Sequence, residues 1–414
     1  MYLEGKSSEF HFLSGPAIEN VVSSGPIYMD MRIAFDAKRA YHNNTGLGNY
    51  SRTLIRDLAK YYPTNDYFLL NPKKSKSHAF DQRNIHEILP QAFLSKTFSS
   101  VWRSKWAVDD LKTLNIDLYH GLSHEIPINI QDTSIKSIVT IHDLIFERFP
   151  DQYNPIDVRI YRKKFGYACR YADRIIAISE QTKRDIIDFY KIQEDKIDVC
   201  YQSCDNIFNS HVSDARKREV AEKLALPKKF FLSVGSIIER KNLLNICKAM
   251  LTVGKVADTP LVVVGQGEGK YRNTVVDFIH QNGLSNKVIF YENADRSDLP
   301  AIFSLSEALI YPSFFEGFGI PILEALSAGV PVITSSTSCL PEAGGDAALY
   351  ADPSQPEEIA ECMLRILNDE GHVSEMIRKG YLHAAKFSNE NCAAKVMESY
   401  RKLIPPDQAV DGIS

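Results

Sequence analysis

The sequence has no apolar run near the roughly 18–20 residues that a membrane-spanning helix requires. Its longest apolar runs, such as Leu261–Gly265, have the length of a buried strand. Cysteine is sparse, with seven residues scattered over 414 positions. An odd, scattered set is a poor disulfide framework and fits a reducing compartment. Although Cys200 and Cys204 are close, no second Cys/His pair has zinc-ligand spacing. We therefore expect buried free thiols.

An excess of positive charge is also missing. The chain has 48 Lys and Arg against 52 Asp and Glu, a net charge of −4, which argues against a nucleic-acid partner bound through bulk charge. Residues 1–30 show no helical or strand periodicity and no signal-peptide pattern. We expect them to be a poorly ordered extension, because Met29 and Met31 directly precede the first strand-like run.

From Met31 onward, short apolar runs alternate with amphipathic segments. This alternation predicts parallel sheets covered by helices, and the length allows two or three domains. We predict an α/β fold of two doubly wound Rossmann-like units, at 31–205 and 206–386, joined by a polar linker at 202–217. A C-terminal helix and tail at 387–414 are expected, the helix packing back on the first unit. The predicted strands are 33–36, 67–70, 118–120, 137–141, 174–178, 197–201, 230–234, 260–264, 288–291, 308–311 and 332–334, and the predicted helices include 48–61, 180–190, 242–252, 270–281 and much of 356–403.

One segment carries most of the chemical information. Tyr-Pro-Ser-Phe-Phe-Glu-Gly-Phe-Gly-Ile-Pro-Ile-Leu-Glu, residues 311–324, follows a predicted strand and opens a helix. Gly317 and Gly319 allow close approach of a ligand, and the helix start favours an anion such as a diphosphate. Glu316 in the loop and Glu324 in the helix can face one cleft. Because phosphate repels carboxylates, sugar hydroxyls are their expected partners. Alternatively, Glu316 caps the helix and Glu324 is solvated.

This segment resembles the Glu-(seven residues)-Glu signature of the retaining glycosyltransferases of family 4, which have the GT-B fold. The resemblance extends from about Met31 to Leu403. It implies that Glu316 contacts hydroxyls of the transferred sugar and that Glu324 binds the ribose of a nucleotide. The backbone amides of Phe318, Gly319 and Ile320 would meet the sugar and the diphosphate.

Basic residues follow another predicted strand, in Val-Gly-Ser-Ile-Ile-Glu-Arg-Lys-Asn at 234–242. Arg240 and Lys241 suit a phosphate group, although a solvated helix start is the ordinary alternative. The resemblance implies that this pair, next to Gly235, clamps the donor diphosphate. Ser236 stands where many relatives have a further basic residue.

The resemblance assigns residues of the first unit and of strand 288–291 as well. His142 ends a predicted strand and is expected to position the donor sugar. The family pattern implies that Gly46 and Gly48 lie under the diphosphate, and that Val288 and Phe290 meet the base through their backbone. Asn49, Tyr50 and His120 are expected on the acceptor side. Two positions depart from the family, Asn293 and the Gln-Ser-Cys-Asp at 202–205.

Other binding signals are weak. Residues 264–270 lack the third glycine of a dinucleotide fingerprint, and no Walker A or Asp-x-Asp sequence is present. We therefore expect no cofactor and no metal, with Arg240 and Lys241 supplying the positive charge. Trp102, Trp106 and nearby lysines predict a basic aromatic face that suits a membrane surface. Buried tryptophans with solvated charges are the alternative. This region comprises 93–106 together with Lys73, Lys74 and Lys76.

Together these features predict transfer of a hexose, with mannose the best candidate, from a nucleotide-diphosphate sugar. The donor would be GDP-mannose or a UDP-sugar, and the acceptor a hydroxyl of a glycan or lipid-linked glycan in surface polysaccharide synthesis. The expected location is the cytoplasm, at the inner face of the membrane. A nucleotide-sugar epimerase on the same fold and a non-catalytic glycan- or lipid-binding subunit are the alternatives.

Overall fold

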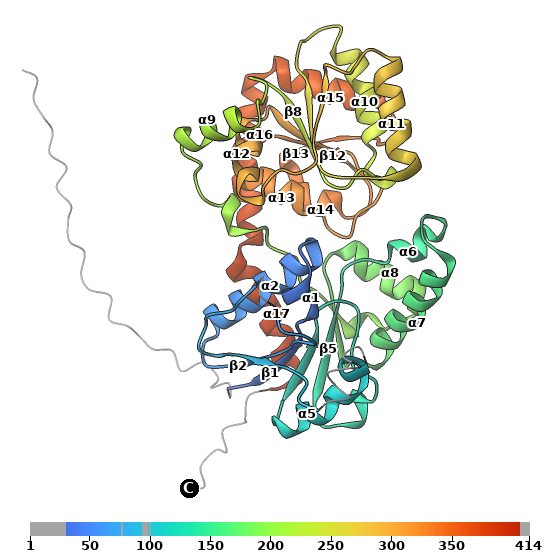
Figure 1. Cartoon of the computed structure of the whole chain (residues 1–414), viewed down its shortest axis with the longest axis vertical. Coiled ribbons are helices and arrows are strands. Elements are labelled where there is room, and N and C mark those ends of the chain that lie inside the picture. Colours follow the sequence, from blue (N-terminus) through green and yellow to red (C-terminus); the bar gives the residue numbers. More distant parts are fainter. Residues whose placement is uncertain (1–29, 76–77, 93–97, 99–100, 406–414) are drawn as a thin grey trace, which may run out of the picture. The chain divides into compact units, whose positions relative to one another are not determined.

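Two parallel β-sheets form the framework of the chain (Figure 1). The computed structural model describes residues 30–405, except 76–77, 93–97 and 99–100. The expected extension therefore lies outside the described residues, as do Lys76, most of segment 93–100 and the tail from residue 406. Residues Asp30–Ile404 form one unit that contains both sheets.

The first sheet has seven strands in the order β3-β2-β1-β4-β5-β6-β7. Residues that alternate along β1 belong to opposite hydrophobic clusters, Ala34 to one and Ile33 and Phe35 to the other. Helices therefore cover both faces of the sheet. The strands are β1 (Arg32–Asp36), β2 (Asp66–Leu70), β3 (Ile85–Ile88), β4 (Leu118–Gly121), β5 (Lys136–Ile141), β6 (Arg174–Ala177) and β7 (Ile197–Val199), and the helices are α1 (Lys38–His42), α2 (Gly46–Tyr61), α5 (Ala107–Thr113), α6 (Ile145–Arg148), α7 (Pro155–Tyr171) and α8 (Glu180–Tyr190).

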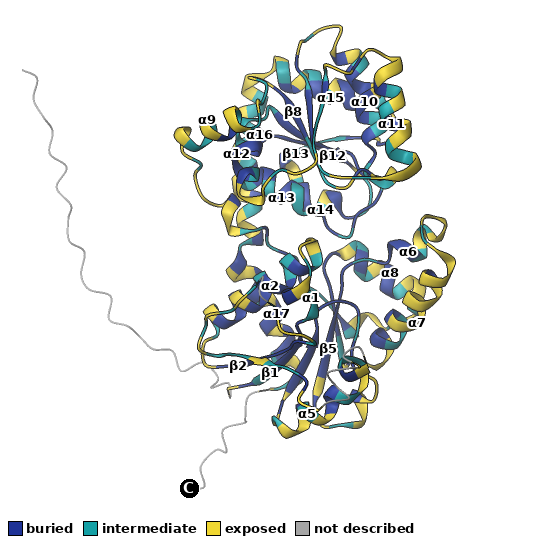
Figure 2. Ribbon diagram, viewed as in Figure 1, coloured by how far each residue is buried: buried dark blue, intermediate teal, exposed yellow. Residues whose placement is uncertain are grey.

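The second sheet has six strands in the order β10-β9-β8-β11-β12-β13. Its central strands are buried on both faces (Figure 2), with Leu232 and Phe231 in opposite clusters. Its strands are β8 (Phe231–Val234), β9 (Leu261–Val264), β10 (Val288–Tyr291), β11 (Ala308–Tyr311), β12 (Val332–Ser335) and β13 (Ala348–Ala351), and the remaining helices are α9 (Asp214–Lys223), α10 (Leu243–Val253), α11 (Gly269–Gln281), α12 (Leu299–Leu305), α13 (Ile320–Ser327), α14 (Leu340–Gly344), α15 (Pro356–Asn368), α16 (Glu370–Ala384) and α17 (Asn389–Leu403).

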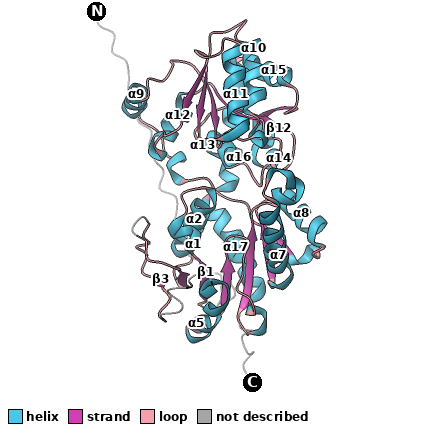
Figure 3. Ribbon diagram, turned by 45° about the vertical axis from the view of Figure 1, so that its right-hand side comes forward, coloured by secondary structure: helices cyan, strands magenta, loops and turns pink. Residues whose placement is uncertain are grey.

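Each sheet contains one point at which the strand order reverses. The reversal lies between β1 and β4 in the first sheet and between β8 and β11 in the second. Figure 3 shows the strands of each sheet enclosed by helices. Because successive connections leave such a point in opposite directions, the loops beyond the carboxyl ends of its two strands diverge and leave a crevice. A ligand site is therefore expected at the loops after β1, β4, β8 and β11.

The α/β class with two parallel sheets is confirmed, and every predicted strand is present. Helix α7 was missed because only four of its 17 residues are buried, so its apolar periodicity is faint. Strands β3 and β13 were missed as well, since most of their residues are only half-buried.

The predicted linker at 202–217 is too long. Helix α9 begins at Asp214, where the side chain of Ser213 accepts a hydrogen bond from the Arg216 amide.

The last helix, α17, packs on the first sheet beside α2 (Figure 1). Its residues Ala393, Val396, Met397 and Tyr400 join the cluster of Ile33 and Phe35. Two hydrogen bonds fix its position. The Tyr400 hydroxyl lies 2.6 Å from Nδ1 of His120, and Nδ2 of Asn389 donates to Oδ2 of Asp57 over 2.7 Å.

All seven cysteines are unpaired, which confirms the expectation of free thiols. In the described part of the chain, no helix is long and apolar enough to cross a membrane. The aromatic face predicted around Trp102 is wrong in one respect. Trp102 is buried, and its Nε1 donates to Oδ2 of Asp110 over 2.6 Å. The ring therefore cannot take part in a surface contact.

We expect Tyr400→Phe to lower the free energy of unfolding by about 1–3 kcal/mol, because it leaves Nδ1 of buried His120 without its partner. Urea unfolding followed by circular dichroism measures this loss. Tyr381→Phe is the matched control, since Tyr381 is 52% exposed. Equal stability of the two variants would show that the His120–Tyr400 hydrogen bond does not hold α17 in place.

Candidate functional site

The switch point of the second sheet brings basic and acidic side chains together. Strand β8 continues into Gly235 and a short 3-10 turn at Glu239–Lys241, and the neighbouring strand β11 continues into the loop at 312–319. Oε2 of Glu316 lies 2.8 Å from Nη1 of Arg240, and Oε1 lies 3.0 Å from Nζ of Lys241. One carboxylate from the β11 loop thus holds both cations of the β8 loop.

Two further side chains fix this arrangement. The Tyr311 hydroxyl, at the end of β11, donates to Oε1 of Glu316 over 3.0 Å and accepts from Nζ of Lys241 over 2.5 Å. Asn242 has a left-handed backbone with φ of 66°. Its Nδ2 donates to the carbonyls of Pro312 over 3.0 Å and Pro353 over 2.6 Å, which ties the basic turn to the β11 loop.

The electrostatics of Glu316 follow from this packing. Burial by itself raises the pKa of its carboxyl, but Lys241 and Arg240 outweigh that effect and lower the pKa to about 2. Glu316 is therefore ionised at neutral pH. The carboxylate of Glu316 contacts both cations, and the charge of Asp143 also acts on Arg240.

Glycines allow the backbone to come close at this site. Gly235 has φ of +131°, and a Cβ there would lie 3.1–3.3 Å from the side-chain end of Lys241. A Cβ on Gly317 would lie 2.4 Å from the carbonyl oxygen of His142. Gly319, with φ of +119°, is the residue before α13, and it provides no side-chain cap for the start of that helix.

Glu324 lies one turn inside α13, and its environment differs from that of Glu316. Burial raises the pKa of its carboxyl to about 7, opposed by Arg296 and reinforced by Asp205. Its carboxylate makes no hydrogen bond or ion pair with any residue that the structure describes. Glu324 is thus a half-buried carboxyl group that is free to accept hydroxyl donors.

His142 follows β5, in the loop region of the first sheet. Its Nε2 lies 2.9 Å from the Leu122 carbonyl oxygen, and its Nδ1 lies 3.0 Å from Nε2 of Gln202, so Nε2 carries the proton and Nδ1 accepts. Burial lowers the pKa of His142 to about 4 despite the Leu122 hydrogen bond. The ring is therefore neutral at pH 7, and the ring of Tyr50 packs edge-on at 4.6 Å.

Hydrogen bonds join the loops of the two sheets at this place. The Ser179 hydroxyl donates to the Gly317 carbonyl over 2.7 Å, next to the close approach of Gly317 and His142. The Glu342 carboxylate accepts from the amides of Glu180 over 2.7 Å and Gln181 over 3.0 Å. His142 and the loop of Glu316 therefore belong to one packed site.

The structure brings many of the predicted residues together and separates others. Glu316, Arg240, Lys241, Gly235, Gly319 and Ile320 surround one switch point, with His142 close by. Phe318 can contribute only its backbone to the site, because its ring stacks on the ring of Tyr201 with 5.5 Å between the ring centroids. Gly46, Gly48, Asn49 and Tyr50 form the first turns of α2, where Tyr50 reaches His142 and Asn49 accepts from Arg52.

One prediction fits the structure poorly. His120 does not reach an acceptor surface, because it is buried and bonded to Tyr400 and to the Thr140 hydroxyl at 2.7 Å. Val288 and Phe290 lie on β10, an edge strand two places away from β8, and their backbone contact with a base stays a prediction. The sequence reasoning also missed Tyr311, Asn242 and Gln202. Tyr311 begins the motif at 311–324 and Asn242 ends the motif at 234–242, which was the available signal.

Within the described residues, no group of three or more His, Cys, Asp or Glu side chains could hold a metal ion.

Residues 45–205 match the family model "Glycosyltransferase Family 4", and residues 215–383 match "Glycosyl transferases group 1". The O-antigen chain mannosyltransferase B of Escherichia coli is 28% identical over 397 residues, which is 90% of this chain and 100% of that protein.

Solved structures show the same fold. A glycosyltransferase from Rickettsia africae superposes with a TM-score of 0.71 at 20% identity, covering 91% of this chain and 100% of the other. Anabaena HepE in complex with UDP and glucose superposes with a TM-score of 0.67 at 18% sequence identity. The match covers 89% of this chain and 99% of the HepE chain. The fold of two facing Rossmann-like domains, GT-B, is thus shared.

The raised pKa of Glu324 predicts a pH-dependent cost in stability. Because the folded pKa of about 7 lies above that of the unfolded chain, the native state binds the extra proton, and stability falls as pH rises through 7. We expect Glu324→Gln to remove this decline. The variant should therefore gain about 1 kcal/mol over the parent at pH 8 but little at pH 4.5.

Urea unfolding at both pH values tests this expectation. Glu361→Gln on the exposed face of α15 is the matched control. A gain of the same size at both pH values would show that Glu324 titrates normally in the folded protein.

Proposed function

Because the chain belongs to the family 4 and group 1 glycosyltransferases, we propose that it transfers mannose from GDP-mannose to a hydroxyl group of a glycan acceptor in polysaccharide synthesis. The observation that carries this proposal is the pairing of Glu316 with Arg240 and Lys241 at a sheet switch point. Mannose is favoured by the named activity of the E. coli relative.

In this proposal Arg240 and Lys241 bind the diphosphate of the donor, and Glu316 binds its sugar. In the reaction, the bond between C1 of the sugar and the diphosphate oxygen breaks, and a bond from C1 to the acceptor oxygen forms. The acceptor proton passes to the departing phosphate oxygen, which leaves GDP. Arg240 and Lys241 stabilise the charge that develops on this diphosphate, since both are held in place before the donor arrives.

Glu316 has two roles in this proposal. Without donor it neutralises Arg240 and Lys241, which would otherwise face each other unpaired in a buried place. When the diphosphate binds these cations, the Glu316 oxygens become available to sugar hydroxyls. Glu324, which has no partner among the described residues, accepts from the ribose hydroxyls one turn further along α13.

His142 acts in positioning rather than as a base. Its ring is neutral and fixed by Leu122 and Gln202, and its carbonyl adjoins Gly317. This contact sets the position of the 316–319 loop against the first sheet. We further propose that the product keeps the α configuration of the donor, with acceptor attack from the same face as the departing diphosphate.

We expect the purified chain to transfer mannose from GDP-mannose to a mannosyl oligosaccharide, and Lys241→Ala to slow this at least tenfold, because one diphosphate cation is lost. Transfer is measured with labelled donor, and the anomeric configuration of the product by NMR. The control is Lys255→Ala, at an exposed residue outside the site. Failure to bind or turn over any GDP- or UDP-sugar would overturn the proposal.

Glu316→Gln separates donor binding from transfer. The variant removes the negative charge that competes with diphosphate for Arg240 and Lys241. We therefore expect GDP to bind as tightly as to the parent or several-fold more tightly, by calorimetry, while transfer falls at least tenfold. Weaker GDP binding in Glu316→Gln would contradict the assigned competition, and unchanged transfer would contradict the assigned sugar contact.

A further inference from the structure

The segment that ends β12 and leads to α14, residues 335–339, consists of small hydroxyl and thiol side chains, Ser-Ser-Thr-Ser-Cys. Because β12 pairs with β11, this segment lies beside the loop at 312–319 that carries Glu316. Its side chains donate hydrogen bonds to the backbone of that loop. The Ser335 hydroxyl, for example, donates to the Ser313 carbonyl over 2.6 Å.

Two residues of this segment hold the backbone of Glu316 itself. The Ser338 hydroxyl accepts from the Glu316 amide over 3.1 Å and donates to the Glu316 carbonyl over 3.0 Å. The Cys339 thiol lies 3.1 Å from the Glu316 carbonyl oxygen and 3.0 Å from that of Phe318. Burial raises the pKa of this thiol well above its ordinary value, so it keeps its proton and acts as a donor.

The peptide groups of the loop are used unevenly. Every carbonyl from 312 to 318 accepts a hydrogen bond from a side chain. The amides of residues 317–320, in contrast, make no hydrogen bond with any residue that the structure describes.

Peptide geometry links these two observations. In a trans peptide the C=O and N–H groups point in opposite directions, and the described residues contain no cis peptide bond. Since the carbonyls of Glu316 and Phe318 point toward Cys339, the N–H groups of Gly317 and Gly319 point away from it. The hydrogen bonds to the carbonyls therefore set the direction of the free donors.

The backbone of Ser338 is itself unusual. Its φ of 56° lies in the left-handed region, which residues with a Cβ seldom adopt and which persists where the surroundings fix it. Glycine adopts this conformation without strain. What serine contributes at this position is therefore its hydroxyl group, which both amide and carbonyl of Glu316 use.

We propose that Ser338 and Cys339 are positioning residues for the transfer reaction, which fix the loop 316–319 so that its free amides face the donor sugar and the departing diphosphate. The inference rests on the proposed function. Neither side chain touches the donor, so their influence passes through the loop. It falls on the geometry of the transition state more than on binding of GDP, which Arg240 and Lys241 hold.

The test uses variants that keep the backbone conformation and lose the hydrogen-bond donor. Ser338→Gly permits the same φ without the hydroxyl, and we expect kcat for mannose transfer to fall at least tenfold, while the Kd for GDP stays within threefold of the parent value. Cys339→Ala should lower kcat at least fivefold. Cys339→Ser, which restores a donor, should stay within threefold of the parent. Circular dichroism checks that each variant is folded at the assay temperature.

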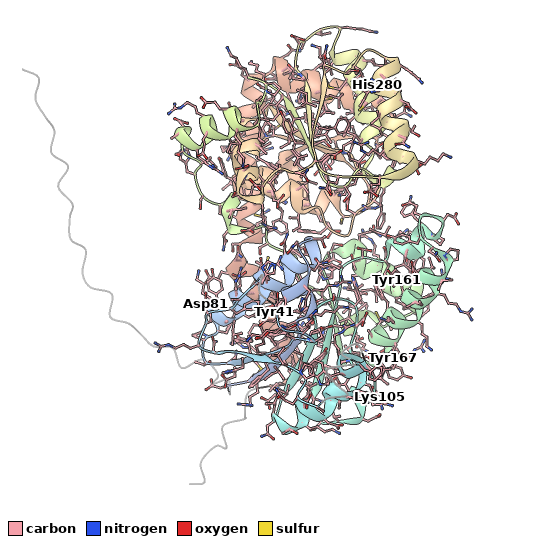
Figure 4. All side chains as sticks on the ribbon, in the orientation of Figure 1. Tyr41, Asp81, Lys105, Tyr161, Tyr167 and His280 are labelled. Atoms are coloured by element: carbon pink, nitrogen blue, oxygen red, sulfur yellow. The ribbon has the colours of Figure 1, made fainter. Side chains whose placement is uncertain are left out.

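Two control variants separate this effect from the substitutions as such. Ala225→Gly makes the same backbone change at an exposed residue with φ of 47°. Ser285→Gly removes a hydroxyl that lies 3.1 Å from Nδ1 of His280. His280 lies on α11, away from the helix α14 that follows Cys339 (Figure 1 and Figure 4). Both controls should transfer mannose as the parent does.

Parent-like kcat in Ser338→Gly would overturn the positioning role, and so would equal losses in Cys339→Ser and Cys339→Ala. A loss of GDP affinity as large as the loss of kcat would show a general structural role instead. If the parent neither binds nor uses any GDP- or UDP-sugar, the proposed function fails. Hydrogen exchange of the Glu316 amide then decides the positioning separately, because Ser338→Gly should accelerate it at least tenfold, and unchanged exchange would refute it.

Discussion

The buried carboxylate of Glu316, held between Arg240 and Lys241, is the interaction on which the site depends. Two cations at 2.8 and 3.0 Å from one carboxylate are stable only if the backbone of both loops is fixed. Pairing of β8 with β11 supplies that constraint, because it places the two loops side by side. Asn242 then ties the basic turn to the carbonyls of Pro312 and Pro353. Removing one partner would leave a buried charge uncompensated, at a cost of about 3–5 kcal/mol.

Both sheets use their switch point in a related way. A pair of basic residues follows the strand at which the order reverses, Lys38 and Arg39 after β1 and Arg240 and Lys241 after β8. The two pairs differ in whether a carboxylate of the neighbouring loop forms ion pairs with them. The β11 loop gives Glu316 to the second pair, whereas Glu125 of the β4 loop is occupied by Arg103 and Lys164. The same topology therefore yields a charge-paired pocket in one sheet and an unpaired cationic rim in the other.

Strands and helices whose formation depends on neighbouring residues were predictable from the sequence. Strands such as β10 and β11 are apolar runs with no competing helical pattern. Helix α8 begins where Ser179 caps it, by accepting a hydrogen bond from the Thr182 amide. The resemblance to a family singled out Glu316, Arg240 and Lys241.

Contacts between distant residues could not be predicted in this way. Lys241 and Glu316 are 75 residues apart, and His120 and Tyr400 are 280 apart, so no periodicity reveals either pair. His120 was accordingly assigned to the acceptor side, although it is buried. Trp102 is buried and bonded to Asp110, as in the alternative interpretation, and the spacing of Trp102 and Trp106 could not decide between that and an exposed face.

The chain that leaves β7 connects the parts of the site more directly than its sequence suggested. Tyr201 stacks on Phe318, and the next residue, Gln202, donates to His142. Adjacent residues thus hold the loop of Glu316 from one sheet and the histidine of the other. Because one peptide unit joins these contacts, a displacement of the 316–319 loop away from His142 must break one of them or strain the backbone between them. The departure from the family pattern at 202–205 therefore falls in a segment that sets the geometry of the site, and Gln202 keeps His142 in a single neutral tautomer there.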